Sequence, residues 1–140
     1  MGIPDTLLLA VRAFGTDLPA ERVAETIAKG VRAAGMPAPD VCPIEDGLPA
    51  SFDVRMRRAR AVVIATGRLD RETLATDRRS ASDVFEIATR ARQAGVPAYA
   101  VTGANELDAF DARMMDLQVI LEARTVRGLA AAGTKLGRLA

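Results

Sequence analysis

The polar residues that follow the apolar run at 61–65 are the chain's best candidates for chemistry. Thr66, Gly67, Arg68, Asp70 and Thr73 all lie within the segment 66–73. A guanidinium binds a carboxylate or phosphate through two parallel hydrogen bonds, and glycine exposes backbone N–H groups to an anion. The turn therefore predicts a phosphate or carboxylate site. The alternative is a self-satisfied turn in which Arg68 pairs with Asp70.

Other polar groups lie near the predicted strand ends and have simpler interpretations. Asp46 of the Asp46-Gly47 pair offers a carboxylate to a ligand, but Asp-Gly is also a common turn dipeptide. Thr16 and Asp17 precede an amphipathic segment and are candidates to meet a phosphate at the helix N-terminus, although capping of that N-terminus is their default role. The arginine-rich segment 55–60 is predicted to be solvated surface.

Some reaction classes are excluded by what the sequence lacks. It contains no histidine, which removes His-based triads and His-ligated zinc, and we predict no metal site. The single cysteine, Cys42, cannot form an internal disulfide, and its apolar neighbours predict a buried core thiol in a reducing compartment. Any chemistry must rest on carboxylates, Arg, Lys, hydroxyls and backbone N–H groups.

Length and charge restrict the class of protein. The 140 residues fit one domain, 1–140, which is large enough to bury a core without a disulfide or a bound metal. Nineteen basic and eighteen acidic residues leave a formal charge of +1, so we expect neither nucleic acid nor a membrane as partner. The N-terminus lacks the basic segment of a signal peptide, and a cytoplasmic protein is expected.

Five short apolar runs alternate with helical periodicity along the chain. The runs that predict strands are residues 7–11, 41–44, 61–65, 98–101 and 119–121. This order predicts an α/β fold, a single Rossmann-like three-layer domain with a mostly parallel sheet of about five strands. Ligands bind beyond the carboxyl ends of the strands in such sheets, so the turn at 66–73 is correctly placed for a site.

Helix boundaries are predicted from capping residues. A capping box at Asp83 and Glu86 predicts the start of one helix, and Asn105 is predicted to cap the next, with Phe110 among its apolar residues. The last helix is predicted to begin at Thr125 and to be weakened by three glycines.

Four segments resemble, in collinear order, bacterial two-domain glycerate kinases. Residues 13–20 resemble the family's DSFKGSLSA opening, and 43–47 resemble its P-(I/M)-ADGGEGT loop. The most specific match is AVVIATGRLDRETL at 61–74, which is similar to ADLVITGEGRLDRQTL, and 95–103 are similar to GVPVIALAG. The resemblance implies a Rossmann-like domain, with ATP, Mg²⁺ and glycerate as the ligands of a working enzyme. It also implies a ligand-binding edge, formed by Asp46, Gly47, Thr66, Gly67, Arg68, Asp70 and Thr73.

The chain departs from the family at positions that serve catalysis. The inserted second domain is absent, Gly15 stands near the family's lysine, and Leu48 and Pro49 replace a Gly-Glu pair. We therefore predict a non-catalytic glycerate-kinase-like domain that binds a small anionic or phosphorylated ligand, or a partner, at the strand ends. Two alternatives stay open: a glycerate kinase that works as a dimer, and a scaffold or interaction protein. A homodimer is expected, because the surface left by the missing domain must be polar or paired.

Overall fold

The sheet at the centre of the molecule is entirely parallel. The computed structural model describes residues 5–44, 47–71 and 79–140. Its five strands are β1 (Leu7–Val11), β2 (Asp40–Pro43), β3 (Ala61–Thr66), β4 (Ala98–Thr102) and β5 (Val119–Glu122). They are ordered β2-β1-β3-β4-β5, and every neighbouring pair is parallel. The predicted α/β fold class is confirmed.

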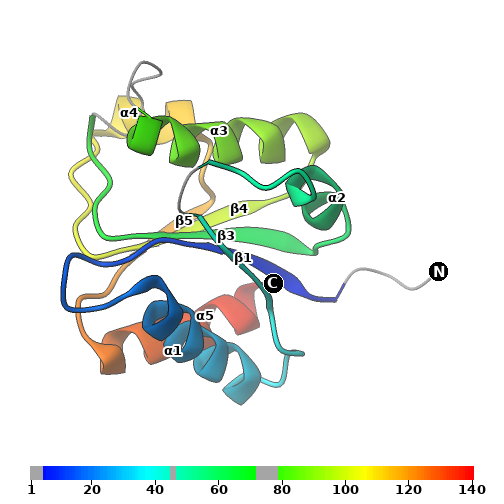
Figure 1. Cartoon of the computed structure of the whole chain (residues 1–140), viewed down its shortest axis with the longest axis vertical. Coiled ribbons are helices and arrows are strands. Elements are labelled where there is room, and N and C mark those ends of the chain that lie inside the picture. Colours follow the sequence, from blue (N-terminus) through cyan, green and yellow to red (C-terminus); the bar gives the residue numbers. More distant parts are fainter. Residues whose placement is uncertain (1–4, 45–46, 72–78) are drawn as a thin grey trace.

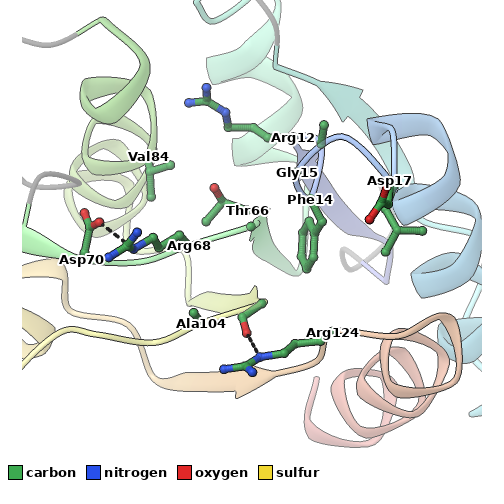
Figure 2. Close-up of a pocket in the computed structure, with 14 residues that line it drawn as sticks. Arg12, Phe14, Gly15, Asp17, Thr66, Arg68, Asp70, Val84, Ala104 and Arg124 are labelled. Carbon is green, nitrogen blue, oxygen red and sulfur yellow. Dashed lines mark hydrogen bonds and ion pairs between the residues drawn. The ribbon is translucent and has the colours of Figure 1, made fainter.

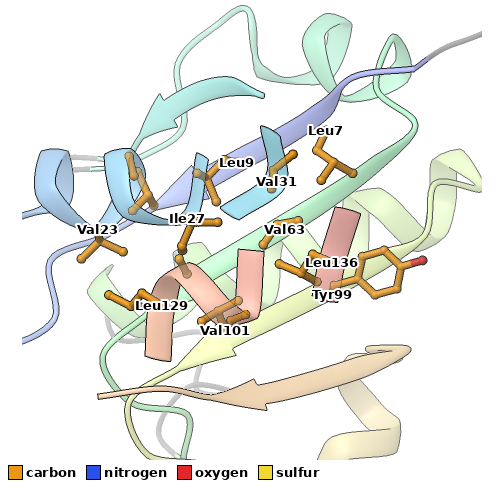
Figure 3. Close-up of a cluster of buried hydrophobic side chains, with 14 of the residues drawn as sticks. Leu7, Leu9, Val23, Ile27, Val31, Val63, Tyr99, Val101, Leu129 and Leu136 are labelled. Atoms are coloured by element: carbon orange, nitrogen blue, oxygen red, sulfur yellow. The ribbon is translucent and has the colours of Figure 1, made fainter. Parts of the chain in front are cut away.

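Helices cover both faces of this sheet (Figure 1). α1 (Ala20–Ala33) and α5 (Val126–Leu139) lie on one face, and α2 (Phe52–Arg57), α3 (Arg79–Ala94) and α4 (Ala109–Met115) lie on the other. Alternate residues of each central strand enter different cores: Leu9 and Val63 face α1 and α5 (Figure 3), whereas Leu8 and Ile64 face the opposite layer. This double burial explains why the strands are continuous apolar runs rather than alternating ones.

Glycines bring α1 and α5 unusually close together. A Cβ at Gly30 would lie 2.0 Å from the carbonyl oxygen of Ala130, and one at Gly133 would lie 2.2 Å from that of Ile27. Gly133 was expected only to weaken the last helix, but here it lets two helix backbones meet. The predicted start of α5 is confirmed, since the Thr125 hydroxyl accepts a hydrogen bond from the Gly128 N–H at 3.0 Å.

Three predicted helix starts are wrong. α3 begins at Arg79, so Asp83 lies inside the helix rather than at its cap. Asp108 caps α4 by accepting from the Asp111 N–H at 2.8 Å, whereas Asn105 accepts from the Leu107 N–H in the preceding turn. Phe110 is 65% exposed and is therefore not a core residue.

The third wrong start concerns α1. Its N-cap is Pro19, without a side-chain capping bond, so neither Thr16 nor Asp17 caps the helix. The cause is a tight turn before the helix, in which the Phe14 N–H donates to the carbonyl oxygen of Leu18 at 2.8 Å. Across the described part of the chain, no helix is both long enough and apolar enough to cross a membrane.

Candidate anion-binding site

A cavity of about 630 Å³ opens at the carboxyl ends of β1, β3 and β4 (Figure 2). Its lining comes mainly from residues 12–15, 17–18, 66–68, 70 and 103–104, with Val84 from α3 and Arg124 from the loop after β5. The chain leaves β1 toward β2 at one side and leaves β3 toward β4 at the other, so the cavity lies where the strand order reverses. Open α/β sheets bind their ligands at this switch point.

The turn after β3 is held in place by one buried leucine. Leu69 is 0% exposed, its N–H donates to the carbonyl oxygen of Ala104 at 2.9 Å, and its own carbonyl accepts from the Glu106 N–H at 2.7 Å. This pairing continues the β3–β4 ladder past the strand ends. Because side chains alternate along an extended segment, burying Leu69 turns Arg68 and Asp70 toward the cavity.

Two glycines let three loops meet backbone to backbone beneath the cavity. A Cβ at Gly103 would lie 2.7 Å from the carbonyl oxygen of Gly67, and a Cβ at Gly67 would lie 3.3 Å from the Cα of Phe14. Any side chain at position 103 would push the loops after β3 and β4 apart. The glycines therefore set the spacing of the loops whose side chains line the cavity.

Arginines surround this cavity from three different strand ends. Arg68 pairs through Nε with Asp70 Oδ2 at 3.0 Å and through Nη2 with Glu106 Oε1. Arg124 Nε donates to the carbonyl oxygen of Gly103 at 2.7 Å, and Arg12 lines the cavity from the end of β1 (Figure 2). The pairing of Arg68 with Asp70, one of the two interpretations of the turn, is thus present in the structure.

The structure brings together four of the predicted site residues. Thr66, Gly67, Arg68 and Asp70 line this one cavity. Gly47 has a φ of +96° in the loop after β2 and is not among the described residues that line it. Asp46 and Thr73 lie outside the described residues.

Sequence reasoning missed three residues at this edge: Arg12, Gly103 and Arg124. Arg12 directly follows β1, Gly103 directly follows β4, and Arg124 lies two residues beyond β5. The sequence feature that could have identified them is their position just after predicted strands. Recognising that they meet at one cavity requires the strand order, which the sequence does not show.

Arginines of the segment 55–60 have no part in this cavity. Arg55 binds Asp40 through Nε at 2.9 Å and Nη2 at 2.6 Å. Arg57, Arg58 and Arg60 are exposed, which confirms the prediction of solvated surface for these three.

The only thiol is shielded rather than reactive. Cys42 is 1% exposed, and burial raises the pKa of its thiol, an effect that the nearby Arg55 guanidinium only partly opposes. Cys42 is therefore a protonated core residue at neutral pH, as predicted. Within residues 5–44, 47–71 and 79–140, no cluster of three potential metal-ligating side chains occurs.

Comparison with known proteins identifies the fold of this chain but not its function. No protein-family model matches the chain, and no curated protein matches it. A putative pilus assembly-related protein from Burkholderia pseudomallei K96243 is similar in structure, with a TM-score of 0.51 and 19% identity over 95% of this chain and 89% of that one. A diflavin flavoprotein A3 from Nostoc sp. has a TM-score of 0.55 and 15% identity over 99% of this chain and 94% of its own. At these identities the likeness defines a Rossmann- or flavodoxin-like three-layer α/β protein.

Proposed function

We propose that this chain is a binding domain for a small anionic molecule, a carboxylate or a phosphate, held in the cavity between the ends of β1 and β3. The observation that carries the proposal is the meeting of Arg12, Arg68 and Arg124 around one cavity at the switch point of the sheet. Guanidinium groups recognise planar carboxylates and phosphates through directed N–H donors.

The cavity also has the size and the mixed lining of a ligand site. Its volume of about 630 Å³ falls within the usual range of small-molecule pockets, about 300–1,000 Å³. Phe14, Leu18 and Val84 supply apolar surface beside the charged groups. An anionic head with a short carbon skeleton suits this combination better than a bare inorganic ion.

The resemblance to glycerate kinases selects the probes. Thermal unfolding would be followed with inorganic phosphate, glycerate, 3-phosphoglycerate and ADP, and with FMN because one structural neighbour is named a flavoprotein. A ligand at ten times its Kd stabilises the folded state by about 1.4 kcal/mol, which raises the Tm of a domain of this size by about 4–6 °C. We expect at least one of these anions to give such a shift.

Matched variants locate the effect. Arg68→Gln should abolish the shift, whereas Arg57→Gln removes the same charge from an exposed position at the end of α2 and should leave the shift intact. No shift with any probe would reject the proposal, and equal loss in both variants would indicate unspecific charge attraction.

The catalytic alternative has its own assay. If the chain is a glycerate kinase that needs ATP and Mg²⁺, a coupled assay detects ADP release with glycerate and Mg-ATP. We expect no release, because the family's lysine and Gly-Glu positions carry other residues here.

A further inference from the structure

The outer edge of the Arg68 guanidinium is divided between carboxylates of two loops. Its Nε pairs with Asp70 at 3.0 Å, and its Nη2 pairs with Glu106. Arg55 shows the usual arrangement, with Nε and Nη2 both donating to the single carboxylate of Asp40. In Arg68, therefore, the Nε and Nη2 donors that usually bind one carboxylate together bind two different carboxylates.

The backbone fixes Glu106 beside this arginine. The Glu106 N–H donates to the carbonyl oxygen of Leu69 at 2.7 Å, so Glu106 lies against the turn that carries Arg68. The preceding residue is held as well, because the Asn105 N–H donates to Glu122 Oε2 at 2.9 Å. These two hydrogen bonds hold the loop that carries Glu106 in place beside Arg68.

The pair is nevertheless easy to separate. The side chain of Arg68 is 62% exposed and that of Glu106 is 48% exposed, whereas that of Asp70 is 25% exposed. Ion pairs in contact with water contribute little to stability, because water solvates the separated charges well. Glu106 also lies outside the described lining of the cavity, unlike Asp70, so its carboxylate binds Arg68 from beyond the site.

We propose that Glu106 is an internal competitor for the anion site. An anion that enters the cavity and takes the Nε–Nη2 edge of Arg68 displaces both carboxylates that hold it, Glu106 from Nη2 and Asp70 from Nε. This exchange lowers the apparent affinity and selects ligands able to present two oxygens to that edge. The inference rests on the proposed function and adds a residue that sets its affinity and specificity.

Calorimetric titration with inorganic phosphate at fixed ionic strength tests the competition. The Glu106→Gln variant should bind phosphate roughly two- to five-fold more tightly than the unaltered protein, the scale expected for release of one exposed ion pair. The control is Glu25→Gln, which removes the same charge from the exposed face of α1 and should leave the Kd unchanged. Glu106→Ala, with its Tm measured beforehand, serves as a second variant.

Each outcome decides between the two proposals. Equal Kd values for Glu106→Gln and the unaltered protein overturn the competitor while leaving the anion site in place. Weaker binding by Glu106→Gln also overturns it, since Glu106 would then orient Arg68. Tighter binding in both Glu106→Gln and Glu25→Gln shows a general charge effect and counts against the competitor. If phosphate and every other probe fail with all the proteins, both proposals fall.

Discussion

At the scale of single residues, burial decides which polar groups can act on a ligand. Leu69 is buried and turns Arg68 and Asp70 toward the cavity, whereas Cys42 is enclosed and its thiol stays protonated. The sequence allowed Arg68 to be a ligand group or half of a closed ion pair. The structure contains that ion pair. In the proposed competition, the same guanidinium binds a ligand once the ligand displaces the carboxylates that hold it.

Burial of Cys42 predicts a specific dependence of stability on pH. Its pKa is raised above the ordinary 9.0 in the folded protein, so the unfolded chain ionises first as pH rises. The contribution of Cys42 to stability is complete below the unfolded pKa and is lost as pH rises toward the folded one. As pH rises from neutral past the unfolded thiol's pKa of 9.0, denaturant unfolding should show a larger loss of stability for the unaltered protein than for Cys42→Ala. Equal losses would contradict the prediction.

At the scale of elements, glycines determine how closely segments pack. Helix propensity alone predicts that Gly133→Ala stabilises α5 by about 1 kcal/mol. The structure predicts the opposite sign, because the new Cβ would lie 2.2 Å from the carbonyl oxygen of Ile27, a backbone atom that cannot rotate away. Overpacking of this kind costs about 1–3 kcal/mol.

Denaturant unfolding measures this effect directly, with Ala131→Gly on the exposed face of α5 as its control. Propensity predicts a loss of about 1 kcal/mol for the control. We expect both variants to be less stable than the unaltered protein. A more stable Gly133→Ala protein would show that α1 and α5 have room between them.

Elements were predictable where the local pattern was strong. All five strands were predicted from apolar runs, and the signal is strongest in β1, β3 and β4, because a strand buried on both faces is a continuous apolar run whatever its neighbours are. The start of α3 did not follow, since residues 79–82 are Arg-Ser-Ala-Ser and carry no apolar periodicity. Asn105 and Asp108 are both good capping residues, and only the packing of the turn selects Asp108.

At the scale of the whole molecule, strand order creates the site. Residues 66–70 were predictable because one strand and its turn carry them. Arg12 and Arg124 belong to loops far apart in sequence, and the order β2-β1-β3-β4-β5 brings them to the same cavity. The homodimer expected from the sequence stays a prediction.

The central claim is that an anion binds between the ends of β1 and β3, and amide chemical shifts during a phosphate titration test it most directly. We expect saturable shifts concentrated at residues 12–15, 66–70 and 103–106, with residues 57–60 of the exposed arginine segment unaffected. Arg68→Gln should remove them. Shifts centred on residues 57–60, or weak linear shifts spread over the surface, would contradict the claim.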